Sequence, residues 1–404
     1  MKRFKKVLLI VLCVLLVIVL AAGTAVAVIW RDEISAYKSI TKLSGRDDSN
    51  NEGSLWYVEV PGDYYFTEFL ETGARSDSEL IAFMTNHLTK GLISAGISET
   101  DLGCSSFTAA LANGDRVMGR NYDMRKTNSI IVRTEASGDR HATLSTSDLN
   151  FLGLDTDTDP SGLMDKLTMT LAVYAPLDGM NDAGVSLSIH MSYQGTTVDE
   201  DGNTRTIATD INTEKPDITS TTMIRLVLDY ADDLDEAIEL ISQYDLHDSA
   251  NTSYHYIIAD ASGRSAILEW VNGTNADDND AGARQLVVTY ADDDAAIGEA
   301  EAALPSSQWM TNYIIQPGYY ADEADMKGLA RYRAIGGQLT AANGVLADEQ
   351  AAMDVLSSVG RRSFMDDQGV TVHSVVYDLT QRTATWVSNE HYGEEAETFT
   401  YSLK

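Results

Sequence analysis

An Asn-Gly pair between two alternating segments restricts the fold of this chain more strongly than its length or composition does. Residues Cys104–Leu111 and Arg116–Asn121 each alternate with a period of two, and Asn113-Gly114 lies between them. Such alternation is typical of strands, and Asn-Gly between two strands is a strong signal for a tight hairpin. We therefore predict an antiparallel hairpin that begins at Cys104.

Further strands and helices are predicted on both sides of this hairpin. The strands have period-two patterns or lie beside turn residues, at Ser54–Val60, Ser129–Thr134, Leu171–Ala175, Val185–Ser192, Tyr254–Asp260, Ser265–Val271, Gln285–Tyr290, His373–Leu379, Ala384–Ser388 and Thr398–Ser402. Helical patterns follow Ser76 and occupy Thr221–Ala231, Asp233–Gln243, Lys327–Leu339 and Asp348–Ser358. Runs of strands with helices between paired blocks predict an α+β fold with antiparallel sheets.

The composition excludes one class of partner. The 404 residues include 61 acidic and 29 basic side chains, for a net charge of −32, and 44% of the residues are hydrophobic. This is the composition of a globular protein with a solvated acidic surface. A nucleic-acid binder needs a basic face that replaces condensed counterions, and the only cluster of Lys and Arg lies in the first six residues. We therefore expect no nucleic-acid partner.

An apolar segment near the N-terminus predicts a membrane anchor. Four cations within residues 1–6 precede an uncharged run of 23 residues, Val7–Ile29. A helix of that length spans about 35 Å, enough for a hydrocarbon core of about 30 Å. The charge bias predicts a cytoplasmic tail, a single-pass anchor over residues 7–30 and an extracellular remainder at the cell membrane. The alternative is a signal segment cleaved near Ala25-Val26-Ala27, which would make the protein secreted.

Export of the remainder makes its single cysteine notable. Cys13 lies inside the apolar run, so Cys104 is the only thiol of the exported part and has no partner for an intramolecular disulfide. A lone exported cysteine is either a small buried hydrophobe or a reactive group. We predict a polar linker over residues 31–53, a pro-segment over 54–103 and a catalytic domain over 104–404.

Cleavage of the Gly103–Cys104 bond would give Cys104 its own base. The new α-amine has an unperturbed pKa of about 8, so that it can accept the thiol proton and return it to a leaving amine. Glycine before the cut allows the backbone to approach the nucleophile closely. A Gly-Cys pair at the start of a strand is compatible with this N-terminal-nucleophile chemistry.

The residues around Cys104 resemble those of the choloylglycine hydrolase family of linear amide hydrolases. The resemblance lies in Cys104-Ser105-Ser106-Phe107, Gly119-Arg120-Asn121-Tyr122-Asp123 and Asp178-Gly179-Met180-Asn181. Arg120 and Asp123 lie sixteen and nineteen residues after Cys104, which are the family's spacings. The resemblance implies a four-layer αββα sandwich of the N-terminal-nucleophile type.

The resemblance also implies roles for individual residues. Cys104 would attack the amide and form a thioester, Asp123 would position the amine, and Arg120 and Arg331 would stabilise negative charge. Asn312, in Thr311-Asn312-Tyr313, resembles the family's oxyanion donor. The stretch His190-Met191-Ser192 occupies the place of a second oxyanion asparagine of bile salt hydrolases, so His190 or a backbone N–H would replace that donor, or the oxyanion hole differs. His190 is a candidate substrate-binding residue, and the alternative is a core histidine. The segment from Asp178 to Gly184 is interpreted as a turn without a catalytic role.

Several alternatives remain open at this point. Arg120 and Asp123 could form a structural ion pair, Asn312 could cap a turn, and Arg331 could be a solvated helix residue. The resemblance implies hydrolysis of small N-acyl amides without a metal or organic cofactor. Acyl transfer by the same thioester and a catalytically silent surface-binding protein are the alternatives, and a homo-oligomer is possible. We also expect Ser54–Ala95 to stay bound to the catalytic domain as a second chain after cleavage.

Overall fold

The computed structural model describes residues 30–91, 103–198, 204–272, 281–292, 304, 306–364 and 369–404, together with Leu16, Thr24 and Val28. The run predicted to cross a membrane, residues 7–30, lies almost entirely outside this part of the chain. Within the described residues, no helix is both long enough and apolar enough to cross a bilayer. The membrane anchor therefore stays a prediction.

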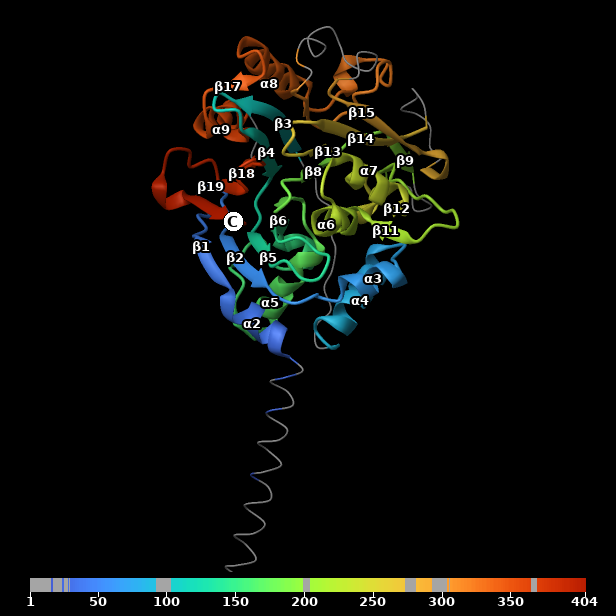
Figure 1. The fold of residues 1–404 in the computed structure, drawn as a ribbon, viewed down its shortest axis with the longest axis vertical. Helices are drawn as coiled ribbons and strands as arrows, with labels where there is room; N and C mark the ends of the chain where they lie inside the picture. Colours follow the sequence, from blue (N-terminus) through green and yellow to red (C-terminus); the bar gives the residue numbers. More distant parts are fainter. Residues whose placement is uncertain are drawn as a thin grey trace, which may run out of the picture.

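Two β-sheets form the centre of the molecule (Figure 1). The larger sheet has nine strands, which in spatial order are β1 (Thr41–Ser44), β2 (Leu55–Val60), β5 (Ser129–Thr134), β6 (Thr143–Asp148), β7 (Asp178–Asn181), β8 (Ser186–Met191), β13 (Tyr254–Ala259), β14 (Ser265–Val271) and β15 (Gln285–Tyr290). All neighbours in this sheet are antiparallel except β2 and β5, which are parallel.

The smaller sheet has seven strands and contains the predicted hairpin. Its spatial order is β16 (Trp309–Met310), β3 (Gly103–Leu111), β4 (Arg116–Met124), β18 (Val370–Asp378), β19 (Thr383–Ser388) and β20 (Thr398–Ser402), with β17 (Val345–Leu346) also paired to β3. Gly114, in the turn between β3 and β4, has a φ of +94°. This left-handed conformation strains any residue with a Cβ, which explains the Asn-Gly pair.

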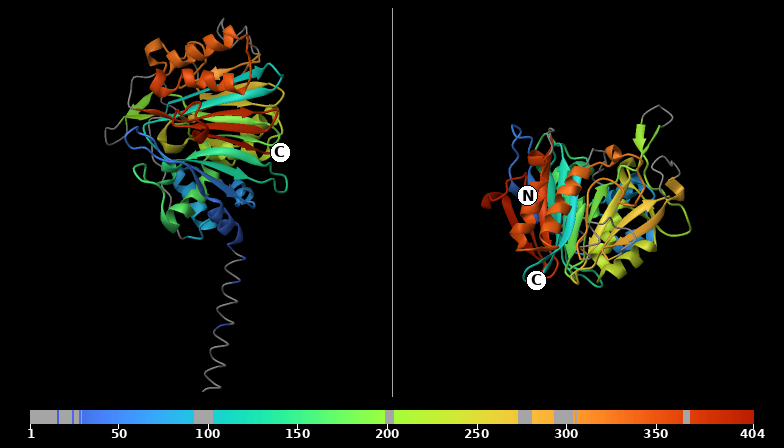
Figure 2. Two further views of the ribbon diagram at one scale, coloured as in Figure 1. Left: turned by 90° about the vertical axis from the view of Figure 1, so that its left-hand side faces the viewer. Right: turned by 90° about the horizontal axis from the view of Figure 1, so that it is seen from above.

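Helices cover the outer faces of both sheets. The nine-stranded sheet carries α3 (Phe66–Thr72), α4 (Asp77–His87), α5 (Gly162–Met169), α6 (Ser220–Tyr230) and α7 (Leu234–Ser242). The seven-stranded sheet carries α8 (Leu329–Ala341), α9 (Glu349–Ser358) and α10 (Arg361–Phe364). Figure 2 shows the sheets side by side, with teal β3 and β4 next to green strands of the larger sheet. The α+β prediction is confirmed, and the layers run helix, sheet, sheet, helix.

Separate apolar clusters hold these layers together. Phe107, Leu339 and Leu356 pack between the seven-stranded sheet and its helices. Between the two sheets, Met118 and Trp386 belong to another cluster, and the Trp386 indole N–H donates to the Thr146 hydroxyl at 2.9 Å. The space between the sheets is therefore partly polar, and this polar part includes the site described below.

The prediction of a linker over residues 31–53 is wrong. Residues Arg31–Ser39 form helix α2, and Thr41–Ser44 form β1, which pairs with β2. The polar composition of this segment concealed its structure, because both elements lie at the edge of the fold and bury few side chains. The predicted strand Ser54–Val60 is confirmed as β2. It pairs with β5, so that the segment before Cys104 contributes strands to the main sheet.

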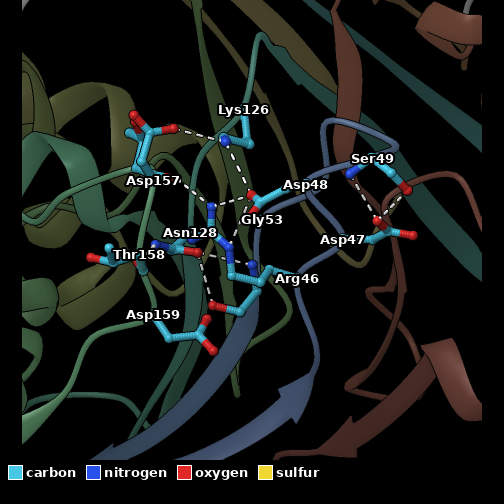
Figure 3. A network of polar contacts seen from close by, with 12 residues as sticks. Arg46, Asp47, Asp48, Ser49, Gly53, Lys126, Asn128, Asp157, Thr158 and Asp159 are labelled. Atoms are coloured by element: carbon cyan, nitrogen blue, oxygen red, sulfur yellow. Dashed lines mark hydrogen bonds and ion pairs between the residues drawn. The ribbon is translucent and has the colours of Figure 1, made fainter.

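A polar network fastens this segment to the body of the protein (Figure 3). Lys126 lies 3.2 Å from the Asp48 carboxylate and 2.8 Å from that of Asp157. Nearby, Asn128 accepts hydrogen bonds from the backbone N–H and the hydroxyl of Ser54. Exposed ion pairs of this kind contribute little alone, so the buried Asn128 contacts are the stronger part of the attachment.

Two other segments differ from the sequence predictions. Residues Thr170–Tyr174 form a 3₁₀ helix, η2, where a strand was predicted over Leu171–Ala175. Asp178–Asn181 form strand β7, where a turn was predicted. Both segments are buried on all sides, and burial of every residue leaves no polar alternation from which the secondary structure can be read.

Candidate active site

Cys104 is the second residue of β3 and is fully buried. Antiparallel pairing places Gly103 opposite Asp123, Cys104 opposite Tyr122 and Ser106 opposite Arg120. The hairpin therefore accounts for the spacing of sixteen and nineteen residues, because it returns both charged side chains to the strand that carries the thiol. The predicted hairpin, with Arg120 and Asp123 on the strand paired to that of Cys104, is confirmed.

Arg120 contacts the sulfur. Its Nη2 donates to Cys104 Sγ at 3.5 Å, and its Nη1 donates to the Leu177 carbonyl at 2.6 Å. Burial raises the pKa of the Cys104 thiol, while the positive charges of Arg120 and Arg331 act in the opposite direction. The net effect is a raised pKa, so the intact chain holds the sulfur mainly as a thiol at neutral pH.

Asn312 and Arg331 contact the backbone of Cys104. The Cys104 N–H donates to Asn312 Oδ1 at 3.0 Å. Arg331, in the first turn of α8, donates from Nη1 to the Cys104 carbonyl and the Ser105 hydroxyl, and from Nη2 to Asn312 Oδ1 at 2.7 Å. Arg331 is buried and is not a solvated helix residue. Two residues more than two hundred positions after Cys104 thus hold its nitrogen and its carbonyl.

The Asn312 amide nitrogen donates to the Met191 carbonyl at 3.0 Å. In this arrangement the side chain positions the cysteine nitrogen, and its own donor is occupied by the backbone of β8. The role of Asn312 as oxyanion donor stays a prediction, because it requires that this contact opens when a substrate binds.

Asp123 lies beside the bond that precedes Cys104. Its Oδ1 accepts a hydrogen bond from the Thr371 hydroxyl at 2.7 Å, and its Oδ2 lies 3.4 Å from Arg331 Nη1. Oδ2 is buried and accepts no hydrogen bond from any described residue. A Cβ at position 103 would lie 3.1 Å from the Asp123 Cβ and 3.2 Å from Oδ2. The absence of a Cβ at Gly103 therefore leaves space for the Asp123 carboxylate.

His190 lies deeper, between the two sheets. Its Nε2 is 2.9 Å from the Ser106 hydroxyl and 3.2 Å from that of Ser188. Burial, followed by the nearby positive charge of Arg120, lowers the pKa of His190 well below its usual value, so the ring is neutral. The ring is fully enclosed. Its contacts are those of a core histidine, and a role in substrate binding stays a prediction.

Asp178 is the charged residue of the site that the sequence analysis missed. It is fully buried on β7, and its Oδ2 lies 3.1 Å from Arg120 Nε. The Asp-Gly-Met-Asn motif was a signal, but it was interpreted as a turn. The contact forms between the two sheets, and the sequence pattern does not predict which residues of different sheets face each other.

Comparisons with known proteins agree with the pattern around Cys104. Residues 104–275 match the model of the linear amide C–N hydrolases, choloylglycine hydrolase family. Asn312 and Arg331 lie outside the matched residues, so their assignment rests on the geometry above. No curated protein sequence gives a significant match to the chain.

Three solved structures are among those similar to this chain. A mutant of the conjugated bile acid hydrolase from Clostridium perfringens is 13% identical, with a TM-score of 0.46 over 74% of this chain and 92% of the other. The penicillin V acylase from Agrobacterium tumefaciens is 15% identical, with 0.41 over 70% and 83%. The Caenorhabditis elegans ortholog of N-acylethanolamine-hydrolyzing acid amidase is 15% identical, with 0.40 over 74% and 100%.

The resemblance inferred from the segment between Cys104 and Asp123 is therefore confirmed, because residues 104–275 carry the pattern of the choloylglycine hydrolase family of linear amide C–N hydrolases.

Proposed function

We propose that this protein hydrolyses linear amide bonds of small N-acyl compounds, with Cys104 as the nucleophile and its own α-amine as the base. The observation that carries the proposal is the convergence of four side chains on one residue. Arg120 contacts the sulfur of Cys104, Asn312 its nitrogen and Arg331 its carbonyl, while Asp123 lies beside the bond before it. A buried cysteine with a purely structural role needs none of these contacts.

The intact chain first has to release the amine. In the proposed step, Cys104 Sγ attacks the Gly103 carbonyl carbon, the Gly103–Cys104 C–N bond breaks, and the nitrogen gains the proton lost by the thiol. Water then hydrolyses the resulting thioester, which leaves a carboxylate on Gly103 and a free thiol and amine on Cys104. Asn312 Oδ1 already accepts the N–H of this nitrogen, so it would hold the same atom as an amine.

The amine then carries the proton during turnover. Its unperturbed pKa of about 8 lets it accept the thiol proton as the sulfur attacks, and return it to the leaving amine of the substrate. The Oδ2 of Asp123 has spare capacity to accept a hydrogen bond from the protonated amine. Arg120 Nη2 would stabilise the thiolate, since charge-assisted hydrogen bonds are about twice as strong as neutral ones.

A small apolar cavity of about 20 Å³ lies close to Arg120, and an apolar acyl group would have to widen it to enter. Its walls include Leu80 and Met84 of α4 together with Leu177 and Ile189 of the main body. The Leu177 carbonyl accepts from Arg120 Nη1, while Arg120 Nη2 donates to the sulfur. A residue of the pocket wall and the thiol therefore contact the same guanidinium group, and the segment before Cys104 supplies one wall of the pocket.

The segment over residues 7–30 is part of the proposal as a membrane anchor. The run of 23 uncharged residues, Val7–Ile29, after a basic tail supports a single-pass protein whose catalytic domain faces outward at the cell membrane. Carbonate extraction of membranes tests this: an anchored protein stays in the membrane fraction, whereas release of the full-length chain contradicts the proposal.

Amide hydrolysis by the purified protein tests the catalytic proposal. We expect release of the free acid from a panel of N-acyl amides, and an acyl mass on the Cys104 peptide after rapid quenching. Cys104→Ala removes both, whereas Ser161→Ala, on an exposed loop, leaves both unchanged. Hydrolysis at the original rate by Cys104→Ala would contradict the proposal. Formation of a new amide when a second amine is added would instead indicate acyl transfer.

A further inference from the structure

Three polar contacts position the guanidinium of Arg120, and only one of them is to the nucleophile. Nη2 donates to Cys104 Sγ, Nη1 donates to the Leu177 carbonyl, and Nε lies 3.1 Å from Asp178 Oδ2. Asp178 is the first residue of β7, in the sheet opposite the strand that carries Arg120, and Leu177 directly precedes it. Two of the three contacts thus come from one short segment of the other sheet.

Two residues of the sheet that carries Arg120 contact the Asp178 carboxylate. The Tyr377 hydroxyl donates to Asp178 Oδ1 at 2.5 Å, and His373 Nε2 lies 3.3 Å from Oδ2. Tyr377 and His373 both belong to β18, which pairs with β4. Burial alone would raise the pKa of Asp178, but Arg120, His373 and Tyr377 lower it, and the net pKa lies below the ordinary value. The carboxylate is therefore ionised.

Resting on the function proposed above, we propose that Asp178 is a positioning residue, which holds the Arg120 guanidinium against the Cys104 thiol across the space between the two sheets. The guanidinium is planar, so contacts to Nε and Nη1 determine where Nη2 points. A buried arginine also needs a compensating charge, and Asp178 supplies it without touching the sulfur. Without Asp178, Nη2 loses its fixed direction toward the sulfur.

A double-mutant cycle tests this inference. Asp178→Asn and Arg120→Gln are made singly and together in the full-length chain, whose state of cleavage is established by intact mass. The Cys104 thiol is titrated by the ultraviolet absorbance of its thiolate, with the same variant carrying Cys104→Ala as the blank. The values of kcat and KM for amide hydrolysis are measured in parallel.

Asp229→Asn is the matched control. Asp229 is also fully buried, lies 2.8 Å from an arginine, Arg225, and accepts a hydrogen bond from a tyrosine hydroxyl, that of Tyr64. It therefore repeats the arginine and tyrosine contacts of Asp178, although burial raises the pKa of Asp229 whereas that of Asp178 is lowered, and Arg225 does not contact the thiol. Loss of stability alone should affect both aspartate variants alike.

We expect Asp178→Asn to raise the thiol pKa by about one unit and to lower kcat about tenfold, with KM changed less than about threefold. Neither effect should appear when Arg120→Gln is already present, and Asp229→Asn should leave the thiol pKa unchanged. An unchanged or lowered thiol pKa in Asp178→Asn overturns the inference. The same shift with and without Arg120 overturns it as well, since Asp178 would then act on the thiol directly.

The inference can also be tested if Asp178→Asn does not fold or if no variant hydrolyses amides. If Asp178→Asn does not fold, Tyr377→Phe replaces it, because that change removes one hydrogen bond to Asp178 and keeps the aromatic ring. It should give a smaller shift in the same direction that again depends on Arg120, and no shift overturns the inference. If no variant hydrolyses amides, the proposed function fails, while the thiol titration still tests the role of Asp178 because it needs no substrate.

Discussion

Tyr174 packs against the segment before Cys104 and helps to attach it to the body of the protein. Four aromatic rings of that segment surround it, with centroid distances of 6.4 Å to Tyr64, 5.7 Å to Phe66, 5.7 Å to Phe69 and 6.0 Å to Phe83. The Tyr174 hydroxyl also donates to the Tyr64 carbonyl at 2.8 Å. We predict that Tyr174→Ala loosens this segment from the body of the protein, whereas Tyr174→Phe does so only slightly.

The magnitude follows from what each change removes. Replacing a fully buried aromatic residue by alanine costs about 3–5 kcal/mol, from lost burial and from the cavity that remains. Replacing Tyr174 by phenylalanine keeps the ring and its four neighbours, and removes one hydrogen bond worth about 1 kcal/mol. The two variants should therefore differ by about 2–4 kcal/mol in the free energy of unfolding.

Urea unfolding of the intact Cys104→Ala chain measures this difference without self-cleavage. In cleaved protein, the urea concentration at which the two fragments separate on gel filtration should fall in the same order: wild type, Tyr174→Phe, Tyr174→Ala. Equal unfolding free energies for the two variants would refute the argument from Tyr174. Fragments that separate without denaturant would refute the expectation that the segment stays bound.

Three further predictions concern other positions. Gly103→Ala should slow cleavage before Cys104 about tenfold, because its Cβ would press against Asp123, as intact mass over time will show. Arg331→Lys should lower kcat/KM about a hundredfold, because an ammonium group cannot make the three directed contacts of the guanidinium. Burial raises the pKa of Asp248 to about 7, so its ionisation should destabilise the fold by at most about 4 kcal/mol as the pH rises from about 4 to 7.

Each of these three predictions has a control variant in the same protein. Gly45→Ala places a Cβ in open space and should not affect cleavage. Arg333→Lys changes an exposed arginine of the same helix, paired with Glu323, and should not affect kcat/KM. For Asp248, the folded-state pKa lies above the unfolded value, so the stabilisation is complete below about pH 4 and is lost toward pH 7. Asp248→Asn should lack this loss, and parallel stability profiles would contradict the assignment.

The hairpin was predictable because its signals are local. Asn113-Gly114 determines the turn, and the turn determines which residues of Cys104–Leu111 and Arg116–Asn121 pair across it. Once these are known, simple counting places Arg120 and Asp123 beside Cys104. Ser76 and Asp233 each cap a helix by accepting the backbone N–H three residues later, which is also a local interaction.

Features that depend on packing between distant elements were not predictable in this way. Residues 170–174 are entirely buried, so no polar alternation distinguishes their 3₁₀ helix from a strand. Helix α2 has only Ala36 buried, and its polar sequence resembles a loop. Asp178 meets Arg120 only because two sheets stack face to face, and the sequence of neither strand specifies which residue of the other lies opposite.

The mass of the purified protein tests the central claim most directly. If Cys104 uses its own amine as base, the active protein contains a chain of 301 residues that begins at Cys104, and N-terminal sequencing gives Cys-Ser-Ser-Phe. Cys104→Ala should leave the bond between residues 103 and 104 intact. A fully active protein in which Gly103 and Cys104 are still joined would contradict the account.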